Sequence, residues 1–190
     1  MEKKRIIVGA TGASGMPVLV KCLELLRESG KFTSHLIISE SGKLTFRQEM
    51  EEELSVLYGL ADEVLDNASI GAGPASGSFR TAGMLIAPCS MKTVAGIRAG
   101  YGENLILRAA DVTIKEQRPL VLAARETPLS PIHLGNLREL SMMPGVRVIP
   151  PMLTFYHRPK SLDEMVYHIA ARLLEPFGIE AREYRRWRGI

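Results

Sequence analysis

The segment that decides the fold reads Arg5-Ile-Ile-Val-Gly9-Ala-Thr-Gly12-Ala-Ser14-Gly15, near the start of the chain. Its first five residues form an apolar run without polar alternation, which predicts a buried strand. The glycines allow a tight turn, and a helical pattern follows from Gly15 to about Ser29. Backbone N–H groups and the helix dipole converge at such a turn, so a phosphate site is predicted there. A strand-to-helix turn without a ligand would also use glycine.

Further short apolar or β-branched runs alternate with helical patterns along the rest of the chain. The runs predict strands at Phe32–Ser39, Met84–Pro88, Leu120–Ala124 and Val146–Ile149. The helical patterns cover Asn104–Gln117, Ile132–Met142 and Leu162–Phe177, the last with a capping box of Ser161 and Glu164. Apolar strands separated by helices are typical of a parallel sheet that is covered on both faces. We therefore expect a doubly wound α/β fold.

Composition limits the kind of protein this can be. The chain has 190 residues, of which 46% are hydrophobic and 24% charged. This length and hydrophobic content predict a single domain over residues 1–190, and we expect about 178 to 190 to form a C-terminal tail. They exclude an intrinsically disordered chain.

Two cysteines, Cys22 and Cys89, cannot build a disulfide framework, and no His/Cys cluster has zinc-ligand spacing. The charged start, Met1–Arg5, leads directly into an apolar strand, so no signal peptide is expected, and no apolar run approaches the roughly 20 residues of a membrane span. These features favour a reducing, cytoplasmic setting and no bound metal.

The formal net charge is +3, and four arginines crowd the last nine residues: Arg182, Arg185, Arg186 and Arg188. Such a cluster can mark a nucleic-acid surface. Glu180 and Glu183 lie among these arginines, and no nucleic-acid-binding motif accompanies them. We therefore interpret the segment as a solvated or subunit-contacting tail and expect no nucleic-acid partner.

Polar groups stand at the ends of several predicted strands. Ser39 ends the second strand, Pro88–Thr93 follows the Met84 strand, and Arg125-Glu126 follows the Leu120 strand. Ligands bind at the carboxyl ends of the strands in open α/β sheets, so these positions and the glycine turn would line one crevice. Helix capping or a surface ion pair would explain each position singly.

Two other patterns have competing interpretations. Tyr156 and Lys160 have the Tyr-x-x-x-Lys spacing of short-chain dehydrogenases, but Pro159 and a helix start at Ser161 would place the pair in a loop. Cys89 is either an activated thiol or a packed small residue.

Arg108, Asp111 and Lys115 share a helix face, which is typical of a solvated salt-bridge ladder. His133 and His157 lie near turns, and their spacing to serines and acids defines no catalytic triad.

Taken in order, these motifs resemble the UbiX-type flavin prenyltransferases, a family that includes members historically named as the B component of phenolic acid decarboxylases. The matching segments span nearly the whole chain: Gly9–Gly15, Pro74–Ser78, Pro88–Thr93, Arg108–Glu116, Arg125–Pro128, Ile132–Leu134, Phe155–His157 and Arg185–Trp187. The sequence differs from many members at Leu19, where they have glycine, and at Gly135, where they have glutamate.

The resemblance implies a flavodoxin-like homo-oligomer, commonly a dodecamer. It also implies transfer of a dimethylallyl group from dimethylallyl phosphate to N5 and C6 of reduced FMN. The prenylated FMN would serve UbiD-type decarboxylases. No Asp-rich pair for magnesium is present, so we expect metal-independent transfer.

The resemblance also assigns residues to roles. It places FMN against Gly12, Ala13, Ser14, Ser39, Ser90, Met91, Lys92, Thr93 and Arg125. It places the prenyl phosphate against Arg108, Lys115, Tyr156, Arg172, Arg185 and Trp187. The implied catalytic residues are Ser14, Glu49, Lys115, Glu126 and Tyr156. Glu126, Glu49, Ser14 and the released phosphate all stay open as acceptors of the C6 proton.

Two other functions fit the same fold. An FMN-dependent cysteine decarboxylase would need a catalytic histidine between the second strand and a Pro-Ala-Ser-Ala-Asn-Thr motif, but this sequence has no histidine between His35 and His133 and reads Pro74-Ala-Ser-Gly-Ser78. A non-catalytic FMN carrier or decarboxylase subunit would need no cationic phosphate site, yet Lys115, Tyr156 and Arg172 are present.

Overall fold

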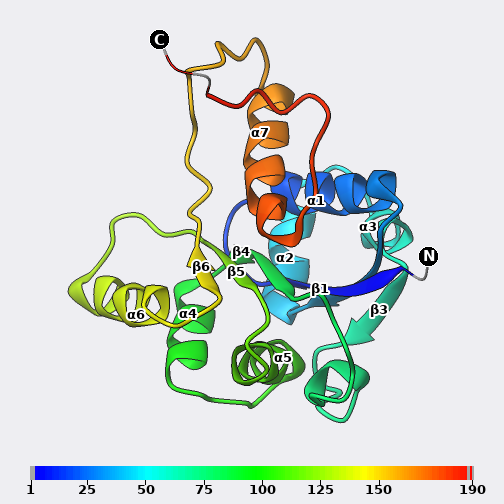
Figure 1. Cartoon of the computed structure of the whole chain (residues 1–190), viewed down its shortest axis with the longest axis vertical. Helices are drawn as coiled ribbons and strands as arrows, with labels where there is room; N and C mark the ends of the chain where they lie inside the picture. The colour runs from blue at the N-terminus through cyan, green and yellow to red at the C-terminus, as the bar shows by residue number, and fades with distance from the viewer. Residues whose placement is uncertain (1–2, 188, 190) are drawn as a thin grey trace.

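The protein is a three-layer α/β structure, seen in a computed structural model that describes residues 3–187 and 189 (Figure 1). The middle layer is one parallel sheet with the strand order β3-β2-β1-β4-β5-β6. The strands are β1 (Lys4–Ala10), β2 (Phe32–Ile38), β3 (Glu63–Asp66), β4 (Met84–Cys89), β5 (Leu120–Ala124) and β6 (Val146–Val148).

Helices cover both faces of this sheet. One face carries α1 (Met16–Ser29), α2 (Glu40–Glu49), α3 (Leu54–Leu60) and α7 (Leu162–Leu174). The other carries α4 (Met91–Arg98), α5 (Leu105–Lys115) and α6 (Pro131–Ser141). Two short 3-10 turns, η1 (Gly73–Ala75) and η2 (Glu175–Phe177), complete the structure. The doubly wound parallel sheet predicted from the sequence is therefore confirmed.

The strand order contains the flavodoxin-like arrangement and extends it by one strand. The five predicted strands, numbered among themselves, run in the order 2-1-3-4-5, which is the flavodoxin order. The sequence analysis missed β3, a four-residue edge strand. Glu63 and Asp66 form its ends, and its side chains are mostly exposed, so it lacks the apolar run that marks the buried strands.

The core lies on both faces of the central strands. Ile6 and Val8 of β1 point into the cluster beneath α1 and α7, whereas Ile7 points into the cluster beneath α4 and α5. This division explains why the first strand is apolar without alternation: both of its faces are buried. Leu19 is fully buried in the first cluster, and Gly135 has open space around it.

Helix ends follow the predicted signals with small differences. The Ser161 side chain accepts a hydrogen bond from Glu164 N, as a capping box requires, but the Glu164 carboxylate accepts from Lys160 N and not from the cap residue itself. A complete capping box occurs where none was predicted, between Ser130 and His133. His133 thus has a structural role at the start of α6.

Among the residues that the structure describes, no helix combines the length and the apolar character that crossing a membrane requires.

Helix α3 offers a direct test of this core. Leu57 is fully buried beneath the sheet, while its neighbour Val56 is 52% exposed. We expect Leu57→Ala to lower the free energy of unfolding by about 2–5 kcal/mol, because the substitution leaves a cavity. Val56→Ala should change it by less than about 0.5 kcal/mol. Urea unfolding followed by circular dichroism measures both, and equal effects would contradict the placement of α3.

Candidate active site

The polar strand ends predicted from the sequence meet at one edge of the sheet. Backbone hydrogen bonds join the segments that follow the strands: Ser39 N donates to Ala10 O at 3.0 Å, Thr11 N to Pro88 O at 3.0 Å, and Arg125 N to Cys89 O at 3.1 Å. The strands β1 and β4 are neighbours whose following helices cover opposite faces of the sheet. Such a switch point is where open α/β sheets bind ligands.

Thr11 holds the two central loops of this crevice together. Its side chain is buried, and its hydroxyl donates to Pro88 O at 3.1 Å and accepts from Ser90 N at 2.8 Å. A single side chain therefore fixes the glycine turn after β1 against the loop after β4. Sequence analysis missed Thr11, although a hydroxyl residue inside a glycine turn is a recognisable signal.

The first N–H groups of α1 have an acceptor within the same chain. Gly15 N and Met16 N both donate to Oε2 of Glu49, at 2.9 and 2.8 Å. Glu49 ends α2, so the anion that the α1 N-terminus attracts is a carboxylate of the same chain. These two N–H groups are therefore occupied by Glu49, and a phosphate at the rest of the glycine turn stays a prediction.

The start of α2 lies at the same edge of the sheet and carries hydroxyl groups that could donate to an anion. The Ser39 hydroxyl accepts from Gly42 N at 3.0 Å and lies 3.1 Å from the Ser41 hydroxyl. A Cβ at Gly12 would lie 2.6 Å from Cβ of Ser41, so only glycine allows the first turn to approach α2 this closely. Ser39 and Gly12 were predicted, whereas Ser41 was missed because a serine within a helix carries no distinctive signal.

The other residues assigned to FMN surround the same crevice. Ser90 is the N-cap of α4, and its hydroxyl lies 3.1 Å from that of Thr93. Ala13 and Met91 are buried, and the remaining assigned residues, Ser14, Lys92 and Arg125, are exposed. Glu126 follows Arg125 and is exposed, with one carboxylate oxygen accepting from Thr127 N at 3.0 Å.

Cys89 is a packing residue at this edge. It is fully buried, and burial raises the pKa of its thiol, which disfavours the reactive thiolate. The activated-thiol interpretation has no support in the structure. Within residues 3–187 and 189, no three histidine, cysteine, aspartate or glutamate side chains form a group that suits a metal ion.

The residues assigned to the prenyl phosphate do not come together within one chain. Arg108 and Lys115 lie on α5, whose apolar side packs on the face of the sheet opposite to α7. Helix α5 starts near Asn67 at the carboxyl edge of the sheet, and after about 16 Å it ends where β5 begins, at the amino edge. Lys115 is therefore at the edge of the sheet opposite to the crevice.

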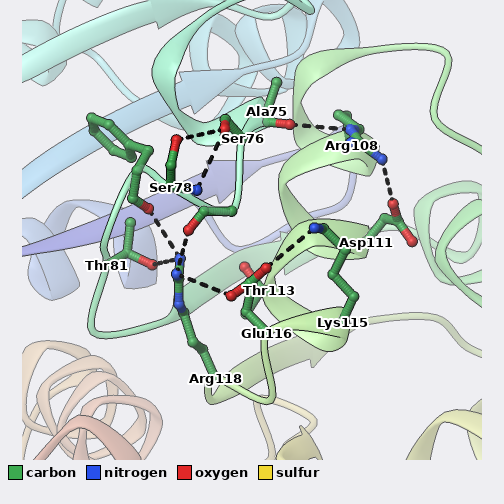
Figure 2. A network of polar contacts seen from close by, with 12 residues as sticks. Ala75, Ser76, Ser78, Thr81, Arg108, Asp111, Thr113, Lys115, Glu116 and Arg118 are labelled. Carbon is green, nitrogen blue, oxygen red and sulfur yellow. Dashed lines mark hydrogen bonds and ion pairs between the residues drawn. The ribbon is translucent and has the colours of Figure 1, made fainter.

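Both cations on α5 belong to a polar network with the loop Pro74–Ser78 (Figure 2). Arg108 bonds Asp111 at 2.7 Å and donates to Ala75 O at 3.2 Å. Lys115 pairs with Glu116 at 3.2 Å and not with Asp111. The predicted salt-bridge ladder thus forms at its first step only, and Lys115 remains half-exposed at the end of the helix.

The other assigned cations lie around an extended segment, residues 149–161, which we call the arm (Figure 1). Tyr156 is 81% exposed on the arm, and its ring centroid lies 5.3 Å from that of Trp187 in the tail. Arg185 donates to His157 O at 3.2 Å, and Arg172 on α7 contacts Glu175. Tyr156 and Lys160 both precede α7, so they share no helix face, as expected, and the dehydrogenase interpretation fails.

Two of the tail arginines make contacts within the chain. Arg186 contacts Glu175 and lies over the Tyr184 ring at 5.5 Å, while Arg185 binds the arm. Arg188 lies outside the described residues. These contacts pack part of the tail against its own chain, and a contact of the tail with another subunit stays a prediction.

Comparison with known proteins identifies the family of this chain. Residues 1–173 match the family model described as Flavoprotein. A probable UbiX-like flavin prenyltransferase of Streptomyces sp. (strain D7) is 48% identical over 186 residues, which cover 98% of this chain and 92% of that protein.

Two solved structures are similar over nearly the full length. A dodecameric FMN-dependent UbiX-like decarboxylase from Escherichia coli O157:H7 has a TM-score of 0.94 and 49% identity, with 97% of this chain and 100% of that chain covered. AnUbiX (PadA1), in complex with FMN and dimethylallyl pyrophosphate, has a TM-score of 0.96 and 39% identity, with both chains fully covered.

The fold and the crevice at its switch point therefore define a flavoprotein. Within that class, the chain belongs to the UbiX-like flavin prenyltransferase family.

The contact between Glu49 and α1 predicts a loss of stability when the carboxylate is removed. We expect Glu49→Ala to lower the free energy of unfolding by about 1–2 kcal/mol, since two helix N–H groups lose their acceptor. Glu49→Gln keeps an acceptor oxygen and should lose less. Glu51→Ala, at an exposed site, is the control in urea unfolding. A Glu49→Ala protein as stable as the control would show that the cap does not form in solution.

Proposed function

We propose that this protein is a flavin prenyltransferase that joins the dimethylallyl group of dimethylallyl phosphate to N5 and C6 of reduced FMN. The observation that carries the proposal is the crevice at the β1/β4 switch point, in a chain 48% identical to a probable UbiX-like flavin prenyltransferase. The related AnUbiX structure contains FMN and dimethylallyl pyrophosphate. The product is prenylated FMN, and its recipient is a UbiD-type decarboxylase.

The crevice fits FMN as the acceptor substrate. Gly12 lets the first turn approach the start of α2 closely, where Ser39 and Ser41 offer hydroxyl donors to a phosphate. On this proposal the flavin lies along the crevice, against the following residues: Gly12, Ala13, Ser14, Ser90, Met91, Lys92, Thr93 and Arg125. Reduced FMN supplies the nucleophilic ring atoms that receive the prenyl carbon.

Cationic side chains must stabilise the phosphate that leaves when the allylic C–O bond breaks. Arg108 and Lys115 lie on α5, while Tyr156, Arg172, Arg185 and Trp187 belong to the arm, α7 and the tail on the other face. One chain cannot bring the two sets together. We therefore propose that each phosphate site combines residues of different subunits, which fits the dodecameric E. coli relative.

Glu126 is the better base of the two glutamates. The Glu49 carboxylate already accepts two backbone N–H groups at the start of α1, so protonating its Oε2 would weaken that cap. Glu126 accepts only from the neighbouring Thr127 N and stands exposed at the carboxyl end of β5. We assign removal of the C6 proton to Glu126 and positioning of the α1 turn, with Ser14 at its exposed edge, to Glu49.

The proposal extends to the setting of the enzyme. We propose that the chain acts as one domain with residues 178–190 as its tail, and that it works in the cytoplasm. The single six-stranded sheet supports the first statement, and two free, buried cysteines support the second.

Activity is tested by incubating the purified protein with reduced FMN and dimethylallyl phosphate under anaerobic conditions, with a metal chelator present. We expect released flavin that carries one added prenyl group by mass and has an altered absorbance spectrum. The chelator should make no difference, because cationic side chains and not a metal hold the phosphate. Recovery of unmodified FMN in all conditions would overturn the proposed function.

The two-subunit site makes a prediction about mixed oligomers. Lys115→Ala and Tyr156→Phe should each reduce kcat/KM for the prenyl phosphate by about tenfold to a hundredfold, with little effect on FMN binding. A native site needs Lys115 from one subunit and Tyr156 from another. In oligomers coexpressed from both variants, each of these two positions is native in half of the sites. Mixed oligomers should therefore recover about a quarter of native activity. A site built within one chain would recover none, so unrestored activity in well-formed mixed oligomers contradicts the shared site.

A further inference from the structure

The arm has few contacts of its own to hold it in place. From Pro150 to Lys160 it forms neither helix nor strand, and it exposes Met152, Leu153, Phe155 and Tyr156 by 71, 52, 64 and 81%. An extended segment of this kind needs side-chain contacts to keep one conformation. The residue next to Tyr156 provides them.

His157 stacks face to face on His168 of α7. The two ring centroids are 3.6 Å apart, and the rings are within 9° of parallel. His168 is buried, with 8% of its surface exposed, and it also contacts the ring of Tyr184 in the tail at 5.3 Å. The pair therefore joins the arm, α7 and the tail at one point, immediately beside Tyr156.

The surroundings of the pair favour uncharged rings. Nε2 of His157 is buried without a hydrogen-bond partner among the described residues. The pKa of His168 is lowered by burial and then by the charges of His157 and Arg185, while Glu164 opposes this shift. The charged groups around His168 come from three elements: Lys21 of α1; Asp163, Glu164 and Arg172 of α7; and Glu183 and Arg185 of the tail.

We infer that the stacked rings of His157 and His168 form a proton-sensitive clasp that positions Tyr156 for the prenyl phosphate and releases the arm in acid. His157 and His168 are thus positioning residues that act through Tyr156, and this role rests on the proposed function. Two protonated imidazoles cannot remain stacked at this separation, because like charges in a buried site repel strongly.

The direction of the pH effect follows from the same contacts. In the released arm, His168 regains an ordinary histidine pKa of about 6.5. The released state then binds more protons than the docked state, so acidification below about pH 6.5 favours release. Above neutral pH this drive toward release is absent, and the clasp is closed.

Trp187 gives a readout of the clasp that does not depend on catalysis. It is the single tryptophan of the chain, and its ring lies 5.3 Å from that of Tyr156. In the flavin-free native protein, we expect the emission of Trp187 to change in a reversible transition as pH falls from 8 to 5. His168→Phe keeps a flat ring but cannot take up a proton, so it should abolish this transition or move it by at least one pH unit.

Two further variants make the test specific. His157→Phe should act like His168→Phe, and it replaces that variant if the latter does not fold by circular dichroism. His133→Asn, which removes a histidine from the cap of α6, is the control and should keep the native transition. A native protein with no transition, or the same transition in the native and both phenylalanine variants, would overturn the clasp.

Kinetics then test the link to Tyr156. We expect KM for dimethylallyl phosphate to rise about tenfold per pH unit below the transition in the native enzyme, with kcat and the Kd of FMN changing much less. The rise should be absent in His168→Phe. The fluorescence transition could behave as expected while no prenyl transfer is detected at any pH. In that case the proposed function is wrong, but the pH-dependent contact between His157 and His168 is confirmed. If transfer occurs with the same KM profile in both proteins, the positioning role is wrong.

Discussion

The hydroxyl of Thr11 is the contact on which the crevice depends. In an open parallel sheet, ligands bind where two neighbouring strands are followed by helices on opposite faces. The loops between these strands and their helices are not held together by strand pairing. The Thr11 hydroxyl replaces this pairing, since it donates to Pro88 O and accepts from Ser90 N in a buried position. Because the buried Thr11 hydroxyl both donates and accepts a hydrogen bond, moving either loop would leave a buried polar group without a partner. These two bonds therefore fix the distance between the glycine turn and the N-cap of α4 before any ligand binds.

Three helices, α1, α2 and α4, start at this edge of the sheet, and the chain treats the first two differently. Glu49 closes the N-terminus of α1, while the start of α2 keeps small, hydroxyl-bearing residues and a close glycine. An open helix start attracts anions, because its N–H groups and dipole are unpaired. The Glu49 carboxylate satisfies the start of α1, so fewer positions at this edge remain for the phosphate of a ligand.

The fold was largely predictable from the sequence because both faces of its central strands are buried, as Ile6, Ile7 and Val8 illustrate. The edge strand β3 was missed because its residues are charged and exposed, and an edge strand is defined by its partner more than by its own composition. Ser39, Ser90 and Arg125 were found because parallel strands end at one edge. The partner of Glu49 was not predictable, since 34 residues separate it from Gly15 and no local pattern records such a contact. The separation of Lys115 from Tyr156 follows from helix placement on opposite faces, which only the three-dimensional structure reveals.

The separation of Lys115 from Tyr156 within one chain offers a reason for the exposed arm. A site at the edge of one sheet, open to water on its outer side, cannot shield a departing phosphate and an allylic cation from solvent. Apolar side chains such as Met152 and Phe155, exposed on one chain, are costly unless another surface covers them. An arm that reaches past its own sheet can cover a neighbouring subunit's crevice, and α5 can offer Lys115 from yet another direction. On the proposed shared site, enclosure and positive charge would be properties of an assembly, and the individual chain would need only to hold its arm and its cations in fixed positions.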